Sequence, residues 1–357
     1  MNIKSLKIGN LVCELPIIQG GMDVGISRYR LAAAVANNGG IGIISSAQIG
    51  YDEEDFQKDQ VKANLRAIDK HIKKAKELAP KGIIGINVMV ALNNYDDYVK
   101  AAVEAGIDLV ISGAGVPLNL PSLVKGTEVK IAPIVSSGKA IKTILKVWDR
   151  KYEATADLVV VEGPRAGGHL GFSLEQLNNN EINLETIFKE VKEEIKQYEI
   201  KYNKAIPVVV AGGIFNGYDI AKYLQLGADG VQIATRFIAT YECDAHDDYK
   251  QAYVNCKKED IVYVKSPVGM PGRGLNNKFI EESKVGQVKT KKCYNCLQMS
   301  ICDRKTNVYC ITEKLIEAAR GDVENGLLFC SDNAHRLDKI VSVAELMEEF
   351  KREINYS

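Results

Sequence analysis

Eight short apolar runs, rich in β-branched residues, recur along the first two thirds of the chain and constrain its fold most strongly. Helix-length segments with apolar residues at three- and four-residue spacing separate most of them, as in RYRLAAAVANNGG and GKAIKTILKVWDR. This alternation predicts an α/β protein built as a (β/α)8 barrel, because a doubly wound sheet has fewer strands and a GxGxxG turn after the first. The eight runs read LPIIQGG, GGIGIISS, GIIGINVMV, DLVISGAG, KIAPIVSS, DLVVVEG, IPVVVAGG and GVQIATR.

Composition sets the class of protein. Of 357 residues, 46% are hydrophobic and 26% charged, and 46 basic residues balance 46 acidic ones. No excess charge marks a nucleic-acid surface, and no apolar run is long enough for a membrane span. The first residues lack the apolar core of a signal peptide, so we expect a cytoplasmic protein with a small-molecule substrate. The sequence is compatible with a homodimer.

The alternation of strand and helix patterns stops near residue 257, which suggests that the chain has three parts. We expect a barrel over 1–256, a cap with a cysteine segment over 257–335, and a closing helix within 336–357. Helical periodicity is expected at 182–204, 312–320 and 342–353. The stretch SPVGMPGRGLNN is expected as a loop, in which Arg273 either is solvated, the more common case, or meets an anionic substrate or a pyridine nucleotide phosphate.

Glycines follow several predicted strands, and the carboxyl ends of barrel strands carry the active site. The glycines of VVVEGPRAGGHLGF, including Gly167 and Gly168, have no side chains, so a ligand can approach the backbone next to His169. The last two strand ends, VVVAGGI and GVQIATR, supply backbone N–H groups from Gly212, Gly213 and the Ala234–Thr235 pair. Loops in these positions commonly bind phosphate, although a glycine pair alone also makes a plain tight turn.

The motifs PIIQGGM, GINVMV, EGPRAGGHLGF, PVVVAGGI and GADGVQIATRFIATYECDAHDDYK resemble the nitronate monooxygenase family. That family also contains the flavin-dependent enoyl-[acyl-carrier-protein] reductase II, and the resemblance spans about residues 13 to 275. It implies FMN bound along the strand ends, with His169 over its reactive face. The implied FMN-binding residues are Gly21, Met22, Asn87, Glu162, Gly167, Gly168, Gly212, Gly213, Gln232, Ile233, Ala234 and Thr235.

Plainer interpretations remain for three of these residues. Asn87 could be a satisfied core amide, Met22 could be core filler, and Glu162 could form a structural salt bridge. His169 could bond only to its own loop. The other histidines, His71 among them, stand in polar contexts and receive no catalytic role.

Two chemistries compete for His169, and an imidazole with a pKa near neutrality would suit either. In a nitronate oxidase it takes the α proton of a nitroalkane or holds the anionic nitronate. In an enoyl-thioester reductase NAD(P)H reduces FMN, and the histidine supports the substrate carbonyl. Glu162 and Leu170 depart from the nitronate oxidase pattern, which often has glutamine and arginine there, and ISGAGVP looks closer to the reductase branch. A non-catalytic flavin-binding redox sensor is a third possibility.

Four cysteines lie within eighteen residues of the cap: Cys293, Cys296, Cys302 and Cys310. Four thiolates so close can hold Zn²⁺ or an iron–sulfur cluster, but the C-x2-C-x5-C-x7-C spacing matches no common zinc ribbon or ferredoxin. Unligated thiols packed in the cap and a redox disulfide are the alternatives.

Overall fold

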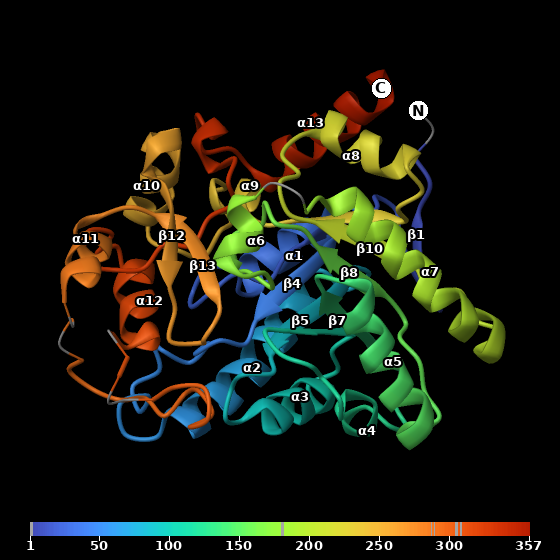
Figure 1. Ribbon diagram of the computed structural model, residues 1–357, viewed down its shortest axis with the longest axis horizontal. Coiled ribbons are helices and arrows are strands. Elements are labelled where there is room, and N and C mark those ends of the chain that lie inside the picture. The colour runs from blue at the N-terminus through green and yellow to red at the C-terminus, as the bar shows by residue number, and fades with distance from the viewer. Residues whose placement is uncertain (1–2, 180–181, 287, 289, 304–305, 308) are drawn as a thin grey trace.

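A computed structural model shows eight parallel strands closed into a barrel, which confirms the predicted fold class (Figure 1). The structure describes residues 3–179, 182–286, 288, 290–303, 306–307 and 309–357. Each predicted apolar run contains one barrel strand. In barrel order the strands are β3 (Ile17–Gln19), β4 (Ile41–Ser45), β5 (Ile83–Met89), β6 (Leu109–Gly113), β7 (Lys130–Val135), β8 (Val159–Glu162), β10 (Val208–Ala211) and β11 (Gly230–Ile233), with β11 pairing with β3.

Side-chain alternation along the strands creates two cores. In β8, Val160 belongs to the small cluster inside the barrel, whereas Val159 and Val161 belong to the large cluster between the barrel and its helices. Both faces of a barrel strand are therefore buried, which is why the runs are continuously apolar. A hairpin of β1 (Leu6–Ile8) and β2 (Leu11–Cys13) adds residues to the inner cluster at the end where the strands begin.

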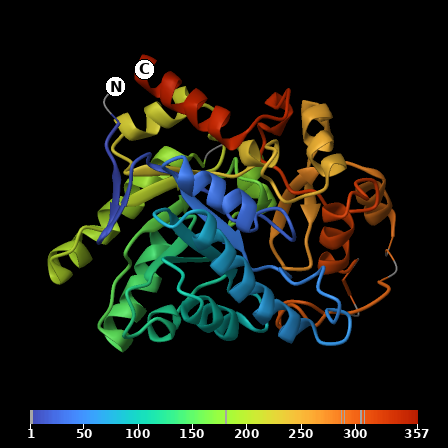
Figure 2. The same ribbon diagram turned by 180° about the vertical axis from the view of Figure 1, so that it is seen from behind.

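The helices form a ring around the strands, and the expected helix endings are confirmed by the positive φ of Gly39 and Gly227. The last helix, α13 (Val343–Tyr356), packs against both α8 (Gly217–Gln225) and α1 (Tyr29–Asn37), so it closes the ring (Figure 2). The other helices of this part are α2 (Gln60–Leu78), α3 (Tyr95–Glu104), α4 (Leu120–Leu123), α5 (Gly138–Tyr152), α6 (Leu174–Asn178), α7 (Leu184–Tyr202) and α9 (Thr235–Ile238).

Beyond the barrel, a small antiparallel sheet of order β12-β13-β9 and further helices form a cap (Figure 1). The expected loop SPVGMPGRGLNN is wrong in part, because Pro271–Leu275 is the central strand β13. Proline is tolerated as the first residue of a strand, and Gly274 lets Leu328 approach its backbone closely. The cap elements are β9 (Gly168–His169), β12 (Ile261–Lys265), α10 (Asp247–Asn255), α11 (Lys278–Val285) and α12 (Ile311–Ala319), with short 3-10 turns at Lys258–Asp260 and Ala334–Arg336.

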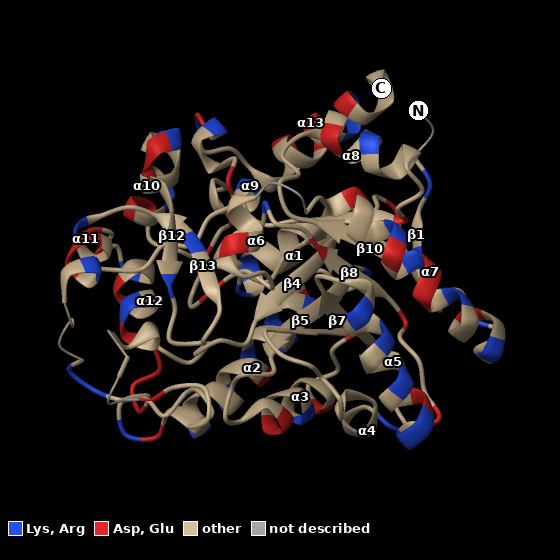
Figure 3. Cartoon of the chain, viewed as in Figure 1, with Lys and Arg blue, Asp and Glu red and all other residues tan. Residues whose placement is uncertain are grey.

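Charges of both signs are spread along the outer helices such as α5 and α7 (Figure 3). The barrel strands carry few charges, as expected for segments buried on both faces. Within the described residues, no helix combines the length and apolar character that crossing a membrane requires.

Candidate active site

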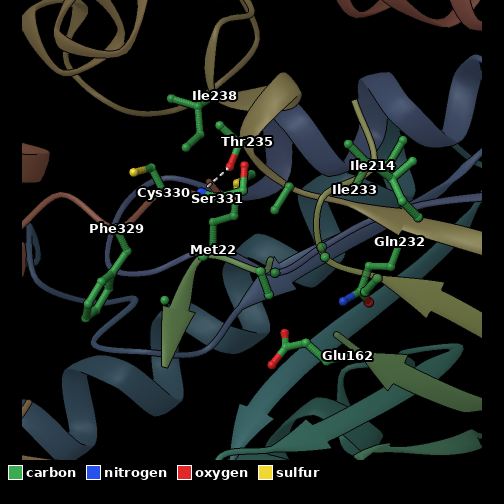
Figure 4. Close-up of a pocket in the computed structure, with 18 of the residues that line it drawn as sticks. Met22, Glu162, Ile214, Gln232, Ile233, Thr235, Ile238, Phe329, Cys330 and Ser331 are labelled. Carbon is green, nitrogen blue, oxygen red and sulfur yellow. Dashed lines mark hydrogen bonds between the residues drawn. The ribbon is translucent and has the colours of Figure 1, made fainter. Parts of the chain in front are cut away.

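The carboxyl ends of β3, β5, β8, β10 and β11 border one cleft of about 820 Å³, partly open to solvent (Figure 4). The cleft brings together all twelve residues that the sequence suggested for a flavin. They are Gly21, Met22, Asn87, Glu162, Gly167, Gly168, Gly212, Gly213, Gln232, Ile233, Ala234 and Thr235. The segment Phe329–Ser331 from the cap forms another side, which the sequence did not indicate.

Two glycines show why the cleft is bordered by backbone rather than by side chains. Gly212 has φ +96°, and a Cβ there would lie 2.9 Å from the carbonyl oxygen of Gly163. Gly168 has φ +73°, and a Cβ there would meet no atom within 4 Å. The first glycine is required by the turn, and the second leaves open space where another residue would place a side chain.

The end of the cleft after β10 and β11 combines the Gly212–Gly213 turn with the start of α9. The Thr235 hydroxyl oxygen accepts a hydrogen bond from the backbone N–H of Ser331 at 3.1 Å, which ties the cap segment to this end (Figure 4). The following residue, Arg236, turns away, because its guanidinium pairs with Glu349 of α13 at 2.8 Å. Backbone groups and a hydroxyl, rather than this arginine, face the cleft.

Glu162 ends β8 and directs its carboxyl group into the cleft (Figure 4). Burial raises the pKa of this carboxyl to about 8, and within the described residues no cation or hydrogen-bond donor offsets that effect. The structural salt bridge considered above is therefore wrong. At neutral pH Glu162 is largely a neutral acid that can donate a hydrogen bond.

Asn87 lines the same cleft from β5. It lies close to the backbone of Gly21, which follows β3, because a Cβ on Gly21 would be 2.5 Å from Asn87 Cβ. It also borders a second cavity, so the interpretation as a satisfied core amide is wrong. Met22 is buried at 7% exposure, yet it too lines the cleft, and its backbone N–H donates to Ser27 Oγ at 2.7 Å.

His169 lies in the second cavity, which adjoins the cleft and shares Gly21, Asn87 and Glu162 with it. Its Nε2 is 2.7 Å from Ser266 Oγ, and its ring meets Phe329 edge-on at 5.0 Å between centroids. Both partners, Ser266 and Phe329, belong to the cap. The imidazole is thus held by groups distant in sequence and does not bond only to its own loop.

The pKa of His169 lies below the near-neutral value that would suit either chemistry. Burial lowers the pKa of the imidazole to about 4, because low-dielectric surroundings disfavour the charged ring. At neutral pH the ring is uncharged, with one nitrogen as donor and the other as acceptor. It can hydrogen-bond a substrate or accept a proton, but it does not offer a permanent positive charge.

Asp23 is a site residue that sequence reasoning missed. It borders both cavities, it has φ +31°, and burial raises its pKa to about 7. A signal was present in the sequence, since QGGMD places a carboxyl group directly after the first strand's glycine pair.

Arg273 is the other missed residue, and its expected place in a solvated loop is wrong. The side chain is only 5% exposed. Its guanidinium donates to the carbonyl oxygens of Ala166 and Pro164, the latter at 2.9 Å, and to the Tyr263 hydroxyl at 3.1 Å. It therefore fixes the turn that presents Gly167, Gly168 and His169.

His71 also differs from the expected polar context. It is buried at 2% exposure, and its Nε2 accepts a hydrogen bond from Arg28 Nε at 3.1 Å. The neighbouring guanidinium and burial lower the pKa of His71 to about 3. It lines neither cavity and remains without a catalytic role.

The four clustered cysteines gather around a cavity in the cap, apart from the cleft. Among the described residues, no group of three or more His, Cys, Asp or Glu side chains is arranged to hold a metal ion. The expectation of a zinc ion therefore finds no support in the geometry.

Comparisons with known proteins identify the family. The family model described as Nitronate monooxygenase matches residues 4–353. The protein described as "Probable nitronate monooxygenase" from Staphylococcus aureus (strain Newman) is 28% identical over 319 residues, which cover 84% of this chain and 86% of the relative.

Two solved structures share the fold of this chain. FabK from Thermotoga maritima superposes with a TM-score of 0.72 at 26% identity, covering 96% of this chain and 93% of that chain. A nitroalkane oxidase from Streptomyces ansochromogenes superposes with a TM-score of 0.73 at 23% identity, covering 96% of both chains, which supports the fold. With a family match along nearly its whole length and the predicted cleft in place, the chain belongs to the nitronate monooxygenase family of flavin-dependent oxidoreductases.

Proposed function

We propose that this protein binds FMN in the cleft and oxidises alkyl nitronates in the adjoining cavity. The observation that carries the proposal is the imidazole of His169, which Ser266 and Phe329 hold in a cavity that shares Gly21, Asn87 and Glu162 with the glycine-lined cleft. The full-length match to the nitronate monooxygenase family supports the same reaction class.

The residues present fit FMN. Bare backbone along Gly167 and Gly168 leaves room for a flat ring, as the open space at the absent Cβ of Gly168 shows. Gly213 and the segment from Gln232 to Thr235 would hold the phosphate through backbone N–H groups and the threonine hydroxyl. Gly21, Met22 and Asn87 would line the ring from β3 and β5, while Gly212 would complete the phosphate turn.

When bound, FMN supplies the electron acceptor for the substrate. The chain's own residues then have three tasks. The neutral Glu162 can donate a hydrogen bond without repelling an anion, Asn87 can orient the ring or substrate by its amide, and His169 can hydrogen-bond a nitronate oxygen or take an α proton. Ser266 engages Nε2, so Nδ1 is the ring nitrogen left for a ligand.

The test is anaerobic titration of the purified yellow protein with an alkyl nitronate, followed by admission of air and product analysis. Bleaching of the flavin by the nitronate is expected. A chain that contains no FMN and takes none up when offered would overturn the proposal.

A second candidate is an NAD(P)H-dependent enoyl-thioester reductase. It is favoured by Glu162 and Leu170, which depart from the nitronate oxidase pattern, and by the FabK structure at 26% identity. Rapid anaerobic bleaching by NADH or NADPH, with reoxidation by an enoyl thioester and no response to nitronate, would select it. Response to neither donor would select a flavin-binding redox sensor.

A further inference from the structure

The cap contains a cavity that the flavin cleft and the proposed reaction do not use. Cys293, Cys296, Cys302 and Cys310 all border it, within a space of about 840 Å³ that is partly open to solvent. Four cysteines around one cavity are unusual outside metal centres and disulfide frameworks, and Cys293, Cys296 and Cys310 form no disulfide.

The cysteine segment is fixed to the barrel beside the strand that carries Asn87. The backbone N–H of Asn93 donates to the carbonyl oxygen of Cys296 at 3.0 Å, and Gln298 donates to Ala91 at 3.1 Å. Leu92 and Leu297 form an antiparallel bridge between these bonds. The cysteines therefore have a defined position over the end of β5.

This position places the cysteine cavity next to the substrate cavity. Cys296, Leu297 and Ile311 border both the cysteine cavity and the cavity that contains His169. A group held by the cysteines would be separated from the substrate by a single layer of side chains.

The arrangement of the thiols does not suit a single metal ion. A single Zn²⁺ needs all its sulfur ligands about 2.3 Å from one point. Among the described residues no three candidate ligands are arranged in this way. A polynuclear iron–sulfur cluster spreads four thiolates around a larger body, so four cysteines around one open space fit it better.

We propose that Cys293, Cys296, Cys302 and Cys310 bind an iron–sulfur cluster of the [4Fe–4S] class at the edge of the substrate cavity. The site is independent of the FMN cleft. Iron and sulfide content measures binding at the cysteine site, whereas FMN content measures binding in the cleft.

The test uses the full chain, purified without oxygen and incubated with equal amounts of ferrous and ferric iron and with sulfide before gel filtration. About four irons and four acid-labile sulfides per chain are expected, with an electron paramagnetic resonance signal after dithionite reduction. C293S and C310S should each lose most of the iron and the signal while keeping the FMN content of the unsubstituted chain.

The matched control is C13S, at the opposite end of the barrel, where the thiol donates to the carbonyl oxygen of Leu15 at 2.7 Å. It should retain both iron and FMN. If a cysteine variant fails to fold, alkylation of the unsubstituted chain decides: Cys293 should be protected after reconstitution and labelled after iron is chelated.

Three results would overturn the proposal: iron no higher than in C293S, one equivalent of zinc in place of iron, or full iron retention in both variants. Loss of FMN binding with an intact cluster would instead refute the proposed function alone. The two proposals therefore fail separately.

Discussion

Burial shifts the pKa values of Glu162 and His169 in opposite directions, and both side chains become uncharged at neutral pH. The common cause is that low-dielectric surroundings disfavour the charged form of either group. A carboxylic acid and a neutral imidazole at one cavity offer hydrogen-bond donors and an acceptor. Neither of these two groups repels an anionic nitronate.

Replacement of the imidazole tests this role. H169A should lower kcat/KM by about 10²- to 10⁴-fold, the usual contribution of a positioned acid or base, while FMN content stays unchanged. Steady-state kinetics with flavin quantification measures both. H246N is the control, because asparagine preserves the helix cap that His246 provides outside the cavities. Full turnover in H169A would remove the catalytic role.

The raised pKa of Glu162 predicts a pH-dependent stability change. The carboxyl has an ordinary pKa of 4.5 and a folded value of about 8. Between these values the folded state holds a proton that the unfolded state has lost, so folding becomes less favourable as pH rises. A glutamine side chain does not ionise, so its contribution to stability does not change with pH. E162Q should therefore gain stability over the unsubstituted chain between about pH 5 and about pH 8, on the order of 3–4 kcal/mol.

Denaturant unfolding of the FMN-free proteins at the two pH values measures this difference. E77Q, at an exposed position on α2, should show no such pH-dependent gain. An equal effect of E162Q at both pH values would contradict the assigned burial.

At the scale of elements, the pairing of β9 with β13 decides where His169 points. The register places His169 opposite Gly272 and Gly168 opposite Arg273. A two-residue strand cannot be stable alone, so its position depends on the cap strand and on the Arg273 guanidinium below the turn. The sequence shows the strand end and the glycines, but not the partner strand a hundred residues later.

R273K should loosen this turn, because one ammonium cannot replace a planar guanidinium that donates to Ala166, Pro164 and Tyr263. We expect the Kd for FMN to rise at least about tenfold and stability to fall by about 1–3 kcal/mol. Fluorescence titration of the apoprotein with FMN measures the affinity. R150K, at an exposed position on α5, should leave both values unchanged, and an unchanged Kd in R273K would exclude the positioning role.

At the scale of the whole molecule, α13 lies against the end of the cleft that we propose holds the phosphate. Phe350 is fully buried and meets Phe237 of α9 at 6.4 Å between ring centroids. The guanidinium of Arg236 lies over Phe350 and pairs with Glu349. The helix that closes the ring thus also holds the short helix that begins at Thr235.

F350A should cost about 3–5 kcal/mol, since a large buried aromatic ring leaves a cavity. Because α9 loses its support, FMN affinity should fall together with stability. Denaturant unfolding and FMN titration measure the two effects. Y356A, 79% exposed on the same helix, should change stability by less than about 0.5 kcal/mol. Equal effects of the two substitutions would contradict the packing described.

From the sequence, periodicity predicted the barrel, and the resemblance to the nitronate monooxygenase family indicated the twelve cleft residues, including Gly21 and Thr235. Apolar runs mark the strands, and barrel topology brings all their carboxyl ends to one rim. Only the tertiary structure decided the charge state of His169 and Glu162, the burial of Arg273 and the part played by Asp23. Those depend on desolvation and on partners such as Ser266 and Phe329, which are far away in the chain and adjoin the site only after folding.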